Sequence, residues 1–129
     1  MKAAIIRAAG KAPVYSDFGE PAPSEGGELI TVNASALSQF SKSWSSGSHY
    51  SLAGSFPSVA GADGVGRTAD GRRVYFVLPE APYVALAEKS LADPAHCVAV
   101  PDSVDDVTAA AIANPGMSAW AALDRKSLV

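Results

Sequence analysis

Thiol and imidazole side chains, the usual ligands of zinc, are few in this sequence. The chain has one cysteine, Cys97, and two histidines, His49 and His96. A single cysteine excludes an internal disulfide and any zinc site built from several thiolates. The three residues form a site only if the fold gathers them. We therefore expect no metal, and we interpret Cys97 as a small core residue.

A glycine-rich stretch, residues 59–78, contains the strongest turn signal in the chain. Its dipeptide Asp70-Gly71 predicts a two-residue hairpin loop of type I′, because both central positions of that turn have positive φ. We therefore predict one strand that ends near Thr68 and a second over residues 72–78. The hairpin would lie in the middle of a β-rich domain.

Three glycines precede this hairpin, Gly61, Gly64 and Gly66. They mark places where the backbone turns or passes close to another backbone. We expect the reactive site to lie on the side of the hairpin that carries these glycines. The spacing G-x-x-G-x-G is not the dinucleotide-binding fingerprint, and a turn follows it in place of a helix. We interpret Asp63 as a structural residue that accepts local backbone N–H groups.

Short apolar or alternating runs between Gly and Pro residues predict the other strands. These strands cover residues 3–6, 14–18, 28–37, 83–89 and 97–100. Because strands come first and helices last, the order predicts a mainly β fold, a partly open barrel or sandwich with a helical exit.

Helical signals occur at two places. Residues 38–47 lose the strand alternation and predict a short helix that Gly47 ends. The run Ser103-Val-Asp-Asp106 fits a capping box, and strong helix formers follow over residues 107–113. Asn114-Pro115-Gly116 would end this helix, and residues 117–126 would form another.

Composition limits the class of protein. The chain has 129 residues, the size of one domain, with 48% hydrophobic residues and a net charge of −3. This charge gives no reason to expect nucleic acid or an anionic membrane as a partner. No apolar stretch reaches the ~20 residues of a membrane span, and the N-terminus lacks the apolar region of a signal peptide. A cytoplasmic, reducing setting is our expectation.

Six stretches, in this order, resemble the N-terminal, GroES-like catalytic domain of the medium-chain dehydrogenases/reductases. They are MKAAIIR, GELITVNASALS, FPSVAGADGVG, DGRRVYFVL, Ala87-Glu88 and DDVTAAAIANPGMSAWAAL. The branch that they resemble most is the zinc-independent quinone oxidoreductases. The resemblance implies a GroES-like, partly open β-barrel with short helices and a C-terminal helical exit.

The sequence departs from the zinc-containing members of that superfamily. Those members have a cysteine near the end of the third strand and a Gly-His-Glu before the central glycines. Here the two regions read Leu37-Ser38-Gln39 and Gly61-Ala62-Asp63. The lobe with four structural cysteines is also absent from the sequence. The resemblance therefore implies a metal-free site.

The resemblance also predicts the domain organisation. Residues 1–113 would be the catalytic domain, and residues 114–129 a connecting helix toward a nucleotide-binding Rossmann domain that this sequence does not contain. NADPH is expected only together with that domain. We therefore expect the 129-residue chain to be inactive by itself.

Four residues are candidates for the site by this resemblance. Residues 38–50 would line the cleft where substrate meets the nicotinamide: Ser38 would donate to a carbonyl or to the nicotinamide amide, and Tyr50 would polarise a substrate oxygen. Asn114 and Ser118 would contact the cofactor. The alternatives are an N-cap for Ser38, a half-buried loop aromatic for Tyr50, and a helix break with a capping residue at Asn114.

The predicted function is the substrate side of an NADPH-dependent oxidoreductase that reduces a small quinone, an activated alkene or a carbonyl compound. The alternative is a freestanding GroES-like binding or assembly module without enzymatic activity. Its exposed interdomain surface would then drive self-association. A third hypothesis, a small metal-binding domain, would need zinc bound at one equivalent per chain.

Overall fold

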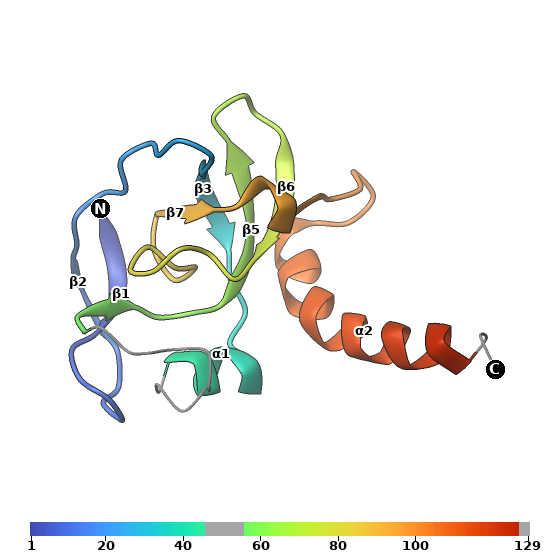
Figure 1. Ribbon diagram of the computed structural model, residues 1–129, viewed down its shortest axis with the longest axis horizontal. Coiled ribbons are helices and arrows are strands. Elements are labelled where there is room, and N and C mark those ends of the chain that lie inside the picture. Colours follow the sequence, from blue (N-terminus) through green and yellow to red (C-terminus); the bar gives the residue numbers. More distant parts are fainter. Residues whose placement is uncertain (46–55, 127–129) are drawn as a thin grey trace.

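The computed structural model describes residues 1–45 and 56–126, and its strands form two antiparallel sheets (Figure 1). The smaller sheet has the order β2-β1-β4, and the larger has the order β7-β3-β5-β6-β8. The strands are β1 (Lys2–Ile6), β2 (Val14–Asp17), β3 (Glu28–Ala34), β4 (Ser58–Val59), β5 (Asp63–Thr68), β6 (Arg73–Val77), β7 (Lys89–Ala92) and β8 (Cys97–Ala99). The helices are α1 (Gln39–Ser45), α2 (Asp106–Lys126) and the short 3-10 helix η1 (Pro94–His96).

The predicted fold class is confirmed: the described residues form a mainly β domain with short helices and one C-terminal helix. The sheets do not close into a continuous barrel within residues 1–45 and 56–126. This arrangement agrees with part of a GroES-like domain.

The strand predicted over residues 83–89 is wrong, because this segment crosses between the two sheets. Leu86 accepts a hydrogen bond from the Ala4 amide of β1 at 2.9 Å. Two residues later, the Glu88 amide donates to Lys2 of β1 at 3.1 Å, and the Glu88 carbonyl accepts from Val32 of β3 at 3.0 Å. Because the backbone N–H and C=O groups of this segment bond to two different sheets, the segment forms a regular ladder with neither. The strand begins only at Lys89, as β7, which pairs with β3.

The hairpin of β5 and β6 is confirmed, but its predicted type I′ loop is wrong. Thr68 N–H donates to the Arg72 carbonyl at 3.0 Å, which leaves a three-residue loop, and only Gly71 in it has positive φ (87°). A type I turn followed by a left-handed glycine is the usual form of such a loop. Asp70 keeps negative φ, and its carboxylate accepts hydrogen bonds from the Thr68 hydroxyl and from Arg72 Nε.

Gly66 allows β5 to approach β3 closely, as the sequence predicts. A Cβ at this position would lie 2.6 Å from Cγ2 of Ile30 and nearer still to the carbonyl oxygen of Thr31. The obstacle includes backbone, so a side chain could be admitted only if the two strands moved apart. Glycine here is a requirement of the sheet.

Helix α2 begins with a different cap from the one predicted. Asp105, not Ser103, is the capping residue: its carboxylate accepts from the Thr108 amide at 2.9 Å and from the Thr108 hydroxyl at 2.7 Å. Both bonds satisfy polar groups of the first turn. They also lower the pKa of Asp105, the hydroxyl bond most of all.

The predicted break at Asn114-Pro115-Gly116 is also wrong, because α2 continues from Asp106 to Lys126 with Pro115 inside it. Proline removes one intrahelical hydrogen bond and opposes the helix by about 3 kcal/mol. Alanine residues on both sides have the highest helix propensity, so the helix resumes beyond the proline.

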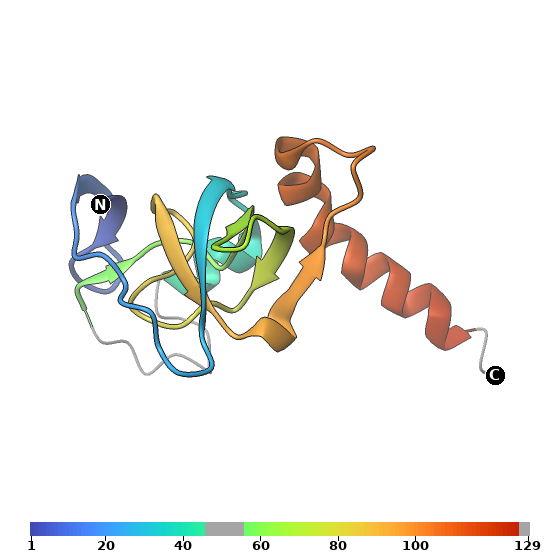
Figure 2. The ribbon, with the colours of Figure 1, turned by 90° about the horizontal axis from the view of Figure 1, so that it is seen from above.

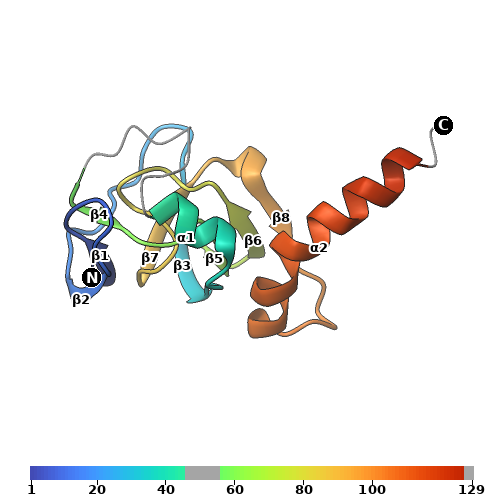
Figure 3. The same cartoon turned by 90° about the horizontal axis from the view of Figure 1, so that it is seen from below.

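Only the first turns of α2 pack on the larger sheet. Ala109 and Ala110 are buried against Val65 of β5, whereas Trp120 is 67% exposed. Figures 2 and 3 show the C-terminal half of the helix extending away from both sheets. No helix in the described part of the chain is both long and apolar enough to span a bilayer.

Candidate functional site

A cleft of about 560 Å³ lies beside α1, within the size range of small-molecule sites. The end of β1, the loop before β2, the segment before α1 and two residues of α1 meet there. Its described lining residues are Ile6, Gly10, Lys11, Ala12, Pro13, Leu37, Ser41, Lys42, Ala60 and Leu86. The lining is therefore mostly apolar, with a hydroxyl and two ammonium groups.

Ser38 is the N-cap of α1, which was one of the two interpretations of this residue. Its Oγ accepts a hydrogen bond from the Ser41 amide at 3.1 Å, and the Ser38 amide donates back to Ser41 Oγ at 3.4 Å. Buried Ser41 also donates from its hydroxyl to the Ala36 carbonyl at 3.0 Å. These bonds fix the start of α1 at the cleft, because they satisfy the first free amides of the helix.

Ser38 itself is not among the cleft's described lining residues, although its neighbour Leu37 is. The structure places the other predicted site residues apart from this cleft or does not describe them. Tyr50 and His49 lie outside the described residues. Asn114 and Ser118 lie on α2, Asn114 half-buried and Ser118 exposed, and neither is among the cleft's described lining residues. The roles of Ser38, Tyr50, Asn114 and Ser118 toward a substrate or cofactor stay predictions.

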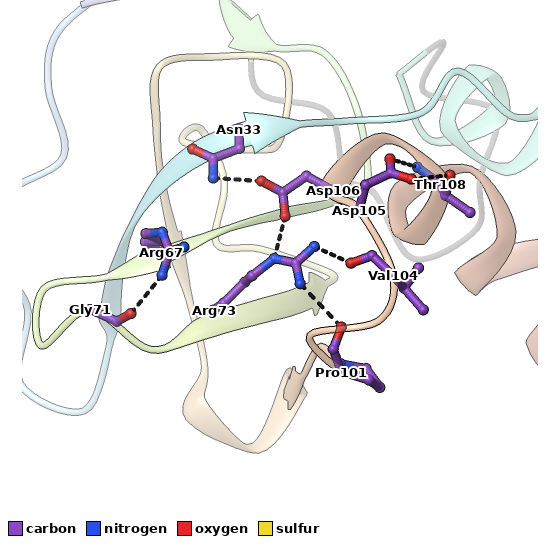
Figure 4. Close-up of polar contacts among 9 residues, drawn as sticks. All are labelled: Asn33, Arg67, Gly71, Arg73, Pro101, Val104, Asp105, Asp106 and Thr108. Carbon is purple, nitrogen blue, oxygen red and sulfur yellow. Dashed lines mark hydrogen bonds and ion pairs between the residues drawn. The ribbon is translucent and has the colours of Figure 1, made fainter.

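A polar network that the sequence did not reveal attaches α2 to the larger sheet (Figure 4). Arg73 of β6 donates from Nε to Asp106 Oδ1 at 2.5 Å, and Asn33 of β3 donates to Asp106 Oδ2 at 2.8 Å. The guanidinium also donates to the carbonyls of Pro101 and Val104, before the helix. Arg73, and then Asn33, hold the pKa of Asp106 below its usual value.

Together with the packing of Ala109 and Ala110 on Val65, this network attaches the first turns of α2, the helix on which Asn114 and Ser118 lie. Sequence reasoning interpreted Asp106 only as the last residue of a capping box at the start of a helix. No local pattern distinguishes Arg73 from its neighbour Arg72, which instead pairs with Asp70. Only the pairing of β6 with its neighbours shows which arginine faces the helix.

A second polar pair joins buried Asp63 of β5 to half-buried Tyr75 of β6. Tyr75 Oη donates to Asp63 Oδ2 at 2.8 Å, while Asp63 Oδ1 is buried without a hydrogen-bond partner. Burial raises the pKa of Asp63, and burial and then Asp63 itself raise that of Tyr75. The predicted bonds from local backbone N–H groups to the Asp63 side chain are therefore wrong. The local bond is from the Ser35 hydroxyl to the Asp63 carbonyl, at 2.7 Å.

Cys97 packs against the buried cluster of Ile30 and Phe76, which agrees with its interpretation as a core residue. It is half-buried, and burial raises the pKa of its thiol to about 11. The thiolate, the nucleophilic form, is therefore scarce at neutral pH. Among the residues that the structure describes, no three His, Cys, Asp or Glu side chains lie close enough to share a metal ion.

Comparison with known proteins gives a likeness in structure only. No protein-family model matches the sequence, and no curated protein matches it. Among solved structures, the quinone oxidoreductase of Thermus thermophilus is 24% identical, with a TM-score of 0.70 over 82% of this chain and 34% of its own. A mycobacterial quinone oxidoreductase is 25% identical, with a TM-score of 0.71 over 85% of this chain and 36% of its own.

A third such structure, the quinone oxidoreductase of Pseudomonas syringae pv. Tomato DC3000, is 23% identical, with a TM-score of 0.68 over 81% of this chain. This chain spans about a third of the length of each of the three proteins (34%, 36% and 35%). It therefore has the fold of one part of a quinone oxidoreductase, as the resemblance in sequence predicted.

Proposed function

We propose that this chain is the substrate-side domain of an NADPH-dependent quinone oxidoreductase. The observation that carries the proposal is the shared fold, with TM-scores of 0.70 and 0.71 over more than four fifths of the chain. The cleft beside α1 supports it, because a flat, apolar acceptor fits a mostly apolar lining. The Thermus thermophilus protein was solved as a complex with NADPH, which suggests the cofactor class.

The described residues do not fit NADPH by themselves. Gly61 precedes β5, Gly64 and Gly66 lie within it, and the turn at Asp70-Gly71 leads into β6, so this glycine-rich stretch does not open a helix. A helix N-terminus after such a stretch is what holds a dinucleotide's pyrophosphate. We derive no hydride-transfer step from this chain, and we propose that a separate nucleotide-binding domain supplies the cofactor.

The share of this chain in the reaction would be to bind and orient the acceptor. Orientation of two reactants is itself a large part of catalysis. Ser38 and Tyr50 are proposed to donate hydrogen bonds to the acceptor oxygen as it gains charge, and Asn114 and Ser118 to contact the cofactor. Since a cofactor carries the electrons in such a reaction, no protein nucleophile and no zinc ion is required.

An NMR titration of the chain tests this proposal. We expect anthraquinones to shift the amide signals of the cleft, such as those of Leu37 and Lys42, with saturable binding. We expect NADPH to shift none of them, and NADPH oxidation to be undetectable with the chain alone. Micromolar NADPH binding would contradict the proposed division between domains. Failure of every quinone to bind would contradict the role in acceptor binding.

The exposed half of α2 favours one alternative, a binding or assembly module. Met117, Trp120 and Leu123 are 49%, 67% and 69% exposed, an apolar surface on a projecting helix. Light scattering across a concentration series distinguishes the two functions. A dimer that Trp120→Ser dissociates, together with no quinone binding, would favour the module over the oxidoreductase domain.

A further inference from the structure

The cleft beside α1 has a one-sided charge. Two lysines, Lys11 before β2 and Lys42 in α1, are among its described lining residues, and no aspartate or glutamate is. The chain as a whole has the opposite balance, with a net charge of −3. The local excess of positive charge is therefore not a consequence of overall composition.

Neither lysine forms an ion pair with an aspartate or glutamate in the described part of the chain. Lys2 pairs with Asp17 at 2.7 Å, and Lys89 pairs with Glu20, but the described ion pairs do not include Lys11 or Lys42. Lys42 lies in the last turn of α1, where a positive charge favours the helix. This helix effect explains a positive charge at Lys42 but not at Lys11, because Lys11 belongs to a loop.

The rest of the lining is apolar. The described apolar lining residues are Ile6, Ala12, Pro13, Leu37, Ala60 and Leu86. With a volume of about 560 Å³, the cleft has room for a fused aromatic ring system. Such a ring would contact these side chains, and the ammonium groups would be left for a charged substituent.

We propose that the acceptor of this cleft is a planar ring compound that carries an acidic group, a carboxylate or a sulfonate, bound by Lys11 and Lys42. This inference rests on the proposed function, because it names the substrate class of the same cleft. The apolar lining supplies affinity for the ring, and the two ammonium groups select acidic acceptors over neutral ones.

The test compares two ligands with the same ring, anthraquinone sulfonate and (hydroxymethyl)anthraquinone, by NMR titration of the whole chain at low ionic strength. Neither has an open quinone carbon that could react with Cys97. We expect the sulfonate to bind about fivefold more tightly, the usual scale of solvent-exposed charge pairs. The preference should disappear at about 1 M NaCl, where the screening length is about 3 Å.

Single variants assign the preference to the two lysines. Lys11→Gln and Lys42→Gln should each weaken sulfonate binding about twofold, since the two lysines together give the fivefold preference, and should leave binding of the neutral ligand unchanged. Lys89→Gln is the matched control: it removes the same charge from β7, outside the cleft, and should change neither affinity. Circular dichroism of each variant verifies that the fold is kept.

The outcomes separate this inference from the proposed function. Equal affinities for the two ligands, or a preference that survives both lysine variants, would overturn the inference and leave quinone binding intact. If neither anthraquinone binds, both proposals are wrong. If methanesulfonate, an anion without a ring, shifts the same signals at the same concentrations, the site recognises anions alone and the proposed acceptor class is wrong.

Discussion

Replacing Arg73 by methionine should loosen α2 from the sheet more than any other single arginine change in the hairpin. Methionine keeps an apolar stem of similar length but removes the bonds to Asp106, Pro101 and Val104. The side chains of Arg73 and Asp106 are only 15% and 26% exposed, so water replaces these bonds incompletely. We expect a loss of about 2–3 kcal/mol in the free energy of unfolding, from one ion-paired hydrogen bond to a carboxylate and two guanidinium hydrogen bonds to carbonyls, all partly replaced by water.

Urea unfolding followed by circular dichroism measures this loss. For a chain of 129 residues, the same change lowers Tm by about 10 °C. Arg67→Met is the matched control in the same hairpin, because Arg67 is exposed and donates to the Gly71 carbonyl at 3.0 Å. We expect the control to lose about 0.5 kcal/mol. Equal losses in the two variants would refute the assignment of Arg73 as the attachment of α2.

The pH dependence gives an independent check of the same pair. The folded protein holds the pKa of Asp106 below its usual value, with Arg73 as the largest cause. The stabilisation is therefore complete above the unfolded pKa of about 3.9, and it is lost as the pH falls through the lower folded value. The difference in stability between the natural chain and Arg73→Met should narrow below a pH of about 4. A constant difference down to pH ~2 would contradict this account.

Three further changes test other parts of the structure. Gly66→Ala should destabilise by about 3 kcal/mol, because its Cβ would meet the backbone of β3, whereas Gly19→Ala faces open space and should stay within about 0.5 kcal/mol in urea unfolding. Burial raises the pKa of Asp63 in the folded chain, so the neutral carboxyl favours folding. The chain should therefore lose stability relative to Asp63→Asn as the pH rises above the unfolded pKa of about 3.9, and parallel pH–stability curves would count against this. Ser38→Ala should cost about 1 kcal/mol through loss of the α1 cap, seen as faster amide exchange in α1, and unchanged exchange there would argue against the cap.

The departures from the predicted elements have a common cause. Residues 83–89 have the composition of a strand, but their partners belong to two different sheets. Pro115 is a strong local signal for a helix end, and the alanine-rich turns on either side outweigh it. In both segments the local pattern is real. The structure formed depends instead on hydrogen bonds to distant strands in the first segment, and on the summed helix propensity of the flanking turns in the second.

The sequence alone determined the elements whose causes are local. A short apolar run predicted β1, alternation predicted β3, Asp70-Gly71 predicted the hairpin, and a helix cap was one of the two interpretations of Ser38. Turns, caps and strand faces depend on residues a few positions apart, so a sequence displays them directly. The resemblance in motif order likewise predicted the fold that the solved structures share with this chain.

Tertiary structure alone decided the long-range pairings. Arg73 meets Asp106 across 33 positions, and Ser35 meets the Asp63 carbonyl across 28. The cleft joins Lys11 to Lys42 through chain segments that have no shared local pattern. Such contacts depend on strand register and on the path of each connection, because a shift of one residue turns every side chain to the opposite face of its sheet.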